Sequence, residues 1–224
     1  PTWLAEGLAE MGQYWKLDKK AVDINPRVIT YLKGTRPKRK LLDIAVPGRT
    51  DPGSWQDYAW RWALCHLLAN NPNYADRFKP LAIALMKQQN GASFESVYGS
   101  TGSQLAFEYA LFLEQLDNGY RADLCAWQWN RKSSRLAGKR RTTVDVSAAR
   151  GWQSSGIQVE PGVSYDLAAV GQWNIAQDGV AYDADGDKLG RGKLIAVIFN
   201  NYELSKTFPI GKLSSFVEIG RAHV

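Results

Sequence analysis

The stretch Trp55–Asn70, WQDYAWRWALCHLLAN, decides the character of the first half of the chain. Apolar and aromatic side chains dominate it, Asp51 to Ser54 offer capping residues before it, and Asn71-Pro72 stop it. It predicts the strongest helix of the sequence.

Further helices are predicted on both sides of this stretch. Asn25-Pro26 is a good helix start, because Asn caps a helix and Pro suits its first position. Helical spacing of apolar residues predicts the other segments. The predicted helices cover residues 3–16, 26–32, 74–89, 102–116 and 120–129. We expect no strand in this half.

The pattern changes after residues 130–143, NRKSSRLAGKRRTT, which are polar and basic. Short β-branched or aromatic runs follow, separated by Gly and Pro turn signals at sandwich-like spacing. The predicted strands are Val144–Val146, Ile157–Val159, Tyr165–Leu167 and Leu194–Phe199. The expected fold is α+β with several domains: a helical part over 1–130, a basic linker over 131–143 and an all-β sandwich module over 144–218.

The last six residues, IGRAHV over 219–224, back-translate into a common sequencing-adapter string. Our hypothesis is that they are an artefactual tail, to be left out of fold reasoning.

The net charge of +6 gathers in two runs, residues 36–40 and 131–141. Aromatic residues do not alternate with these charges, so we interpret both runs as solvated connectors and expect no nucleic-acid partner. No stretch is long and apolar enough to predict a membrane span. The two cysteines, Cys65 and Cys125, match no metal-binding spacing. One disulfide and two buried free thiols remain alternatives for them.

The first ten residues, PTWLAEGLAE, carry the most specific chemical signal. Gly7 lies inside a helical pattern, where Gly is about 1 kcal/mol less favourable than Ala. A helix tolerates this Gly when another backbone must come close. Glu6 stands beside it, while Trp3 and Glu10 lie on one face, a turn to either side.

These residues resemble the second active-site helix of the gluzincin zinc metallopeptidases, whose pattern is Trp-Leu-x-Glu-Gly-x-Ala. Trp3, Leu4, Glu6, Gly7 and Ala9 match it position by position. In that family a preceding helix carries His-Glu-x-x-His, with two zinc ligands and the general base. The resemblance implies that Glu6 is the third protein ligand of a catalytic zinc, whose activated water attacks a peptide or protein substrate. It implies that Glu10 does not bind the zinc and at most contacts one of its ligands.

The chain departs from this family in one respect, because no His-Glu-x-x-His occurs in it and its histidines are His66 and His223. We therefore expect the first zinc helix upstream of Pro1 in an intact parent protein. We also expect the chain alone to be inactive, and the face that Gly7 opens to lack its partner helix.

The rest of the helical part resembles uncharacterised peptidase-like proteins of the planctomycete type, through residues 25–27, 58–64 and 94–99. In such enzymes a later Tyr or His donates to the tetrahedral oxyanion. Tyr58 and His66 are the candidates, and ordinary helix packing is the alternative for both.

Residues 151–171, 190–195 and 208–211 resemble the calcium-dependent, galactose-binding bacterial lectins. This resemblance concerns the β-sandwich scaffold and implies a glycan partner, but it assigns no sugar-binding residue. Trp152 and Trp173 can stack on a sugar or pack within the unit.

The alternating carboxylates Asp183, Asp185 and Asp187 can bind calcium, but a calcium-binding EF-hand loop needs Gly and Glu where Lys188 and Leu194 stand. A polar hairpin turn is therefore the better interpretation.

Three functions follow as hypotheses, and the third of them is a purely structural helical scaffold. The first is a fragment of a zinc metallopeptidase with an accessory carbohydrate-binding-like module. The second is a non-catalytic glycan- or cell-surface-binding protein with a degenerate peptidase-like domain. Both resemblances imply a secreted or cell-envelope location.

Overall fold

The computed structural model describes residues 1–14, 20–45, 53–136, 138, 140–174, 179–189 and 191–211, together with the backbone of 215–218. The chain divides into two compact units. The helical unit comprises Pro1–Trp127 with Arg150–Trp152, and the β unit comprises Gln128–Ala149 with Gln153–Val224. The basic segment predicted as a linker belongs to the β unit in this division.

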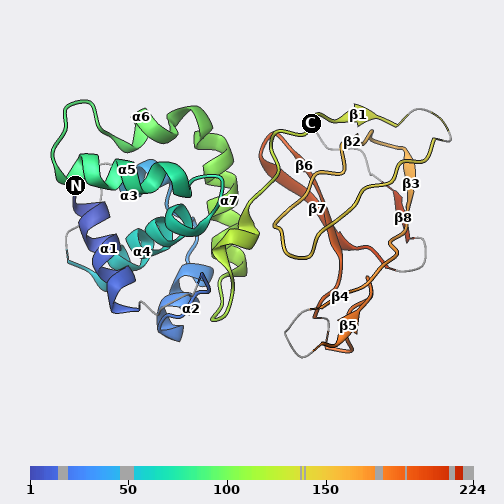
Figure 1. Ribbon diagram of the computed structural model, residues 1–224, viewed down its shortest axis with the longest axis horizontal. Helices are drawn as coiled ribbons and strands as arrows, with labels where there is room; N and C mark the ends of the chain where they lie inside the picture. The colour runs from blue at the N-terminus through green and yellow to red at the C-terminus, as the bar shows by residue number, and fades with distance from the viewer. Residues whose placement is uncertain are drawn as a thin grey trace. The chain divides into compact units, whose positions relative to one another are not determined.

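The elements follow one another from helices to strands (Figure 1). The helices are α1 (Thr2–Gln13), α2 (Pro26–Gly34), α3 (Leu41–Ala45), α4 (Trp55–Asn70), α5 (Ala75–Met86), α6 (Phe94–Tyr98) and α7 (Gly102–Gln115), with the 3₁₀ helices η1 (Gly99–Thr101) and η2 (Ala122–Cys125). The strands are β1 (Ser134–Arg135), β2 (Ile157–Gln158), β3 (Ser164–Leu167), β4 (Trp173–Asn174), β5 (Ala181–Tyr182), β6 (Ile195–Asn200), β7 (Glu203–Pro209) and β8 (Ser215–Glu218).

Helix α4 is the centre of the helical unit. Every side chain from Ala59 to Leu68 is buried, as expected for a helix that is apolar on nearly all sides. Its start is fixed by Ser54, whose Oγ accepts the Asp57 backbone N–H at 3.1 Å. The predicted helix over 55–70 is confirmed at both ends.

The helices around α4 follow the predicted order. Asn25 caps α2 by accepting the Arg27 N–H at 2.9 Å, with Pro26 at the first helical position. The helices predicted at 3–16, 26–32, 74–89 and 102–116 are present with small shifts at their ends, as α1, α2, α5 and α7. The short helices α3 and α6 were not predicted.

The basic run over 36–40 has local uses within the helical unit. Lys38 and Arg36 donate to carbonyl oxygens at the C-terminal end of α2, including Lys33 O at 2.9 and 2.6 Å. Helix ends leave such carbonyls without partners, and cations there are favourable. Arg39 pairs with Asp57 in the first turn of α4. The basic run therefore stabilises the C-terminal end of α2 and the N-terminal end of α4.

The prediction of a helix over 120–129 is wrong. Only the four-residue turn η2 forms there, because the backbone just before it pairs with residues 21–22 instead. Val22 N–H donates to Tyr120 O, and Gly119 N–H donates to Val22 O, each at 2.8 Å. Gly119 has a φ of +88°, which turns the chain away from a helical path.

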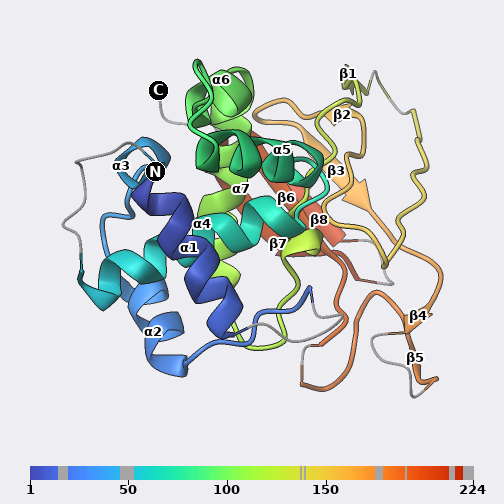
Figure 2. The ribbon, with the colours of Figure 1, turned by 60° about the vertical axis from the view of Figure 1, so that its left-hand side comes forward.

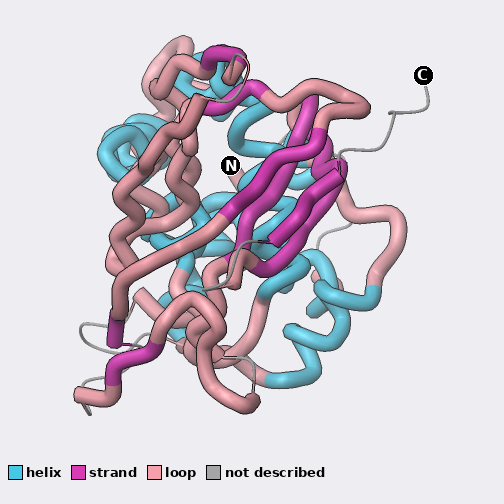
Figure 3. Tube along the Cα trace, turned by 90° about the vertical axis from the view of Figure 1, so that its right-hand side faces the viewer, coloured by secondary structure: helices cyan, strands magenta, loops and turns pink. Residues whose placement is uncertain are grey.

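The described strands of the β unit form four separate two-stranded sheets, β1–β2, β3–β8, β4–β5 and β6–β7. The longest pair is the antiparallel hairpin β6–β7, which is seen in magenta in Figure 3. The runs predicted at 157–159, 165–167 and 194–199 overlap β2, β3 and β6, with ends that differ by one residue. The strand predicted at Val144–Val146 is wrong, since the backbone there is irregular.

The fold is thus mixed helix and sheet, but no sandwich is seen in the described part of the β unit. A sandwich needs two apolar faces packed on each other. Among the described residues of this unit Ala184 alone is buried, while Val170 and Leu189 are 94% and 79% exposed. The residues of the suspected tail, 219–224, lie outside the described ranges.

Candidate functional site

Helix α1 holds the motif residues against α4, and the two helices cross in contact (Figure 2). Trp3, Leu4 and Gly7 are buried. A Cβ on Gly7 would lie 2.4 Å from the Sγ of Cys65 and 2.8 Å from the carbonyl oxygen of Arg61. The predicted reason for Gly7, a close second backbone, is confirmed. The expectation that this face lacks a partner helix is wrong, because α4 occupies it.

Glu6 stands at the edge of this crossing and forms an ion pair. The Nη1 of Arg61 donates to Oε2 of Glu6. The Arg61 side chain is 2% exposed and that of Glu6 is 23% exposed. Burial lowers the pKa of Arg61 below its ordinary value, yet a guanidinium stays charged at neutral pH. Glu6, the predicted metal ligand, is therefore already paired with a cation that the protein itself supplies.

The donor set around Glu6 does not fit a catalytic zinc. Such a zinc takes three protein ligands. Within the described ranges no three His, Cys, Asp or Glu side chains come together in a way that could hold a metal ion. Glu10 lies one turn further along α1, where partial burial raises its pKa. What the described residues offer is one carboxylate that already binds a guanidinium.

His66, one of the two candidate oxyanion donors, is held by aromatic packing. His66 stacks between Trp62 and Phe112, with ring centroids 5.2 and 6.0 Å away. It follows Arg61 by five residues, which places it about 140° around the helix axis. His66 therefore packs towards α7 while Arg61 reaches α1. Tyr58 is half-buried on α4. Of the two alternatives for His66, oxyanion donor and helix packing, the structure shows helix packing.

Buried His66 makes the helical unit sensitive to acid. Burial lowers the pKa of His66 from 6.5 to about 4, against a raising contact with the Lys20 backbone. The unfolded chain therefore takes up this proton first, and stability falls as the pH drops below 6.5. We expect the free energy of unfolding to fall by about 2 kcal/mol more between pH 7 and pH 5 than in the variant His66→Gln. Urea titrations at both pH values measure it; equal losses would contradict it.

A buried polar network was missed by sequence reasoning. The Glu108 carboxyl group of α7 is fully buried. Its Oε2 accepts Asn71 Nδ2 at 2.5 Å, and its Oε1 accepts Asn73 Nδ2 at 2.8 Å and the Trp127 N–H at 3.2 Å. The network joins α7 to the end of α4 and to the last residue before the β unit. Its only signal was a Glu inside the apolar run FEYALFL.

Both cysteines are buried free thiols, which decides between the two alternatives left open. Cys65 lies under Gly7, and burial raises its pKa. Cys125 lies 2.9 Å from the Tyr120 hydroxyl, and its pKa is raised by burial to about 12. Thiols of this kind are poor nucleophiles at neutral pH, so neither supplies a reactive group.

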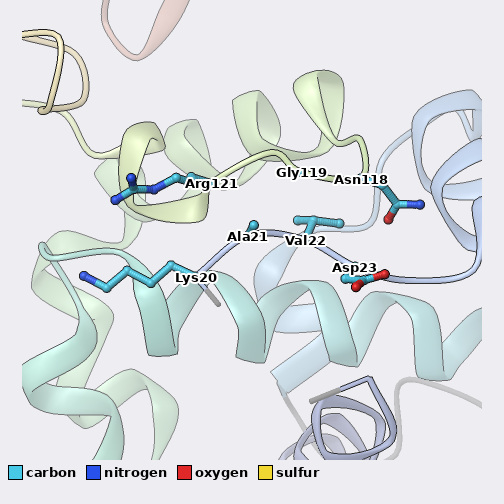
Figure 4. A pocket seen from close by; sticks show the side chains of 7 residues that line it. All are labelled: Lys20, Ala21, Val22, Asp23, Asn118, Gly119 and Arg121. Carbon is cyan, nitrogen blue, oxygen red and sulfur yellow. The ribbon is translucent and has the colours of Figure 1, made fainter. Parts of the chain in front are cut away.

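An open pocket of about 520 Å³ lies where residues 20–23 run beside 118–121 (Figure 4). Lys20 and Arg121 extend to the same end of it. Arg121 donates to both carboxylate oxygens of Asp123, at 3.0 and 2.5 Å, and Lys20 Nζ is 3.9 Å from the same side chain. The two cations, Lys20 and Arg121, are matched by two carboxylates, Asp123 and the pocket-lining Asp23, so the pocket offers little net charge to a ligand.

The aspartate run of the β unit forms a polar turn, as predicted. Asp183 Oδ1 accepts the Asp185 N–H at 3.1 Å. Asp187 Oδ2 accepts Arg191 Nε at 2.7 Å, so this carboxylate also has an internal cation. Calcium binding at this turn stays the less favoured alternative.

The two tryptophans considered for sugar stacking both have packing contacts. Trp152 stacks on Trp127 at 5.2 Å within the helical unit. Trp173 donates its Nε1–H to Gly192 O at 3.1 Å in the β unit.

Comparison with known proteins gives no further lead, since no family model, no curated protein and no solved structure matches the chain. In the described part of the chain, no helix has the length and apolarity needed to cross a membrane.

Proposed function

We propose that the helical unit is a peptidase-derived domain without catalytic activity, carried in one chain with a lectin-like β module that attaches it to glycans or cell-surface material. The observation that carries the non-catalytic assignment is the ion pair between Glu6 and the buried Arg61. A carboxylate whose charge is already balanced offers a divalent cation little attraction. The sandwich fold of the module and its glycan partner rest on the lectin resemblance alone.

The zinc metallopeptidase remains the second candidate, and the packing of Gly7 favours it. The match to Trp-Leu-x-Glu-Gly-x-Ala is supported by a helix whose Trp3, Leu4 and Gly7 are buried while Glu6 stays partly exposed. In that case the missing histidine ligands must come from a further helix. We derive no catalytic step, because the described residues do not fit the zinc.

The chain alone is expected to show no zinc-dependent hydrolysis of casein or of a mixed peptide library. The reason is that Glu6 is a single ligand and is paired with Arg61. A fluorescence release assay with added zinc, and with a chelator as blank, measures this. Turnover that disappears in Glu6→Ala but persists in Glu10→Ala, a matched carboxylate on the same helix, would contradict the expectation.

The coding sequence before Pro1 separates the two candidates. A His-Glu-x-x-His motif there, with zinc-dependent hydrolysis by the longer protein that is lost in Glu6→Ala, would establish the peptidase and reject the non-catalytic domain. A longer protein without the motif and without hydrolysis would support the non-catalytic domain.

A further inference from the structure

The charge on Glu6 is balanced from inside the helical unit. Arg61 is among the largest fully buried side chains of the molecule, and its guanidinium contacts Glu6 at the margin of the α1–α4 crossing. A buried guanidinium is stable only when anions or other acceptors surround it. Glu6 is thus one of the groups that permit Arg61 to lie in the interior.

The geometry at Gly7 keeps this pair together. The Arg61 carbonyl oxygen lies 2.8 Å from the place where a Gly7 Cβ would stand, so the backbones of α1 and α4 are nearly in contact there. Glu6 precedes Gly7 and moves with it. Arg61 can therefore leave Glu6 only by a rotamer change inside a packed interior or by separation of the two helices, while Glu6 can turn away only by leaving the buried guanidinium without this anion.

We infer that Arg61 takes the place of a metal ion as the permanent cation at Glu6, and that the pair locks α1 onto α4 without metal. This inference rests on the proposed non-catalytic function, and it names Arg61 as the group that replaces the metal. A Zn²⁺ ion at Glu6 would lie beside the Arg61 charge, and their repulsion disfavours binding.

A double-mutant cycle on the full chain tests the lock. The variants are Glu6→Gln, Arg61→Met and the pair of them, followed by urea unfolding. We expect the two substitutions to be non-additive, with a coupling of about tenfold or more in the unfolding equilibrium constant. The matched cycle of Glu10→Gln with Arg61→Met should be additive. If Arg61→Met does not fold, Arg61→Gln, which also removes the charge, closes the same cycle. Additivity for Glu6 and Arg61 overturns the inference.

A metal titration supplies the second test. Added Zn²⁺ and added chelator are expected to leave the unfolding midpoint of the wild-type chain unchanged. A midpoint that rises with Zn²⁺ in the wild type, and no longer does so in Glu6→Gln, overturns the inference and favours the peptidase. Additivity without a zinc effect overturns the inference alone and leaves the non-catalytic domain standing, so the two failures are distinguishable.

Discussion

Gly7→Ala is expected to lower the free energy of unfolding of the helical unit by about 3 kcal/mol. The new methyl group would lie within 3 Å of the Cys65 Sγ and of the Arg61 backbone, and backbone cannot turn aside as a flexible side chain can. Overpacking therefore exceeds the gain of about 1 kcal/mol that Ala brings to a helix interior. Seven of the nine tryptophans belong to the helical unit, so tryptophan fluorescence in urea follows its unfolding.

Gly12→Ala is the matched control on the same helix. No neighbouring atom lies within 4 Å of a Cβ at Gly12, so we expect a small gain in stability, about 0.5 kcal/mol. Cys65→Ala added to Gly7→Ala should restore only part of the loss, because the Arg61 carbonyl oxygen remains. If Gly7→Ala stabilised the protein as Gly12→Ala does, the close contact of α1 and α4 would be disproved.

Local signals predicted the local structure well. Ser54 and Asn25-Pro26 fix helix starts through contacts within three residues, so the sequence alone locates α2 and α4. The role of Gly7 was also predictable, since a Gly inside a helix needs a reason. The identity of its neighbour was not, because Arg61 and Cys65 lie more than fifty residues away along the chain.

The sequence predictions that failed did so because long-range contacts, rather than local signals, decide the structure there. The helix predicted over 120–129 lost to a long-range pairing with Val22, which no local pattern indicates. Val144–Val146 has strand-forming residues but no partner strand, and a strand needs one. The zinc-ligand role of Glu6 stays a prediction from the resemblance, whereas the cation that Glu6 contacts, Arg61, comes from α4 and is indicated by no local pattern. The sequence singles out Glu6 as a candidate, but the cation that Glu6 contacts could be known only from a tertiary contact.

Glu108→Ala is expected to lower the free energy of unfolding by about 3–5 kcal/mol. It would deprive Asn71, Asn73 and the Trp127 N–H of a shared acceptor in a region where Glu108 itself is fully buried. Each buried donor left without a partner costs about 1–3 kcal/mol, and water entering the space recovers a part. Because three separate segments meet at this carboxyl group, the loss should reach the whole helical unit rather than one helix end.

Two further variants on α7 make this result interpretable. Glu114→Ala removes an exposed carboxyl group from the same helix and is expected to change stability by less than about 0.5 kcal/mol. Glu108→Gln keeps the size and one acceptor oxygen, but its new NH₂ group faces a donor in either orientation. That donor is Asn71 Nδ2 at the one oxygen position, or Asn73 Nδ2 and the Trp127 N–H at the other. Asn71 cannot simply turn its amide, since its Oδ1 already accepts the Asn73 N–H at 2.9 Å. Glu108→Gln should therefore lie between the other two in urea unfolding. A loss in Glu108→Ala no larger than that in Glu114→Ala would mean that the network adds no net stability, and that apolar packing around α4 alone holds these segments together.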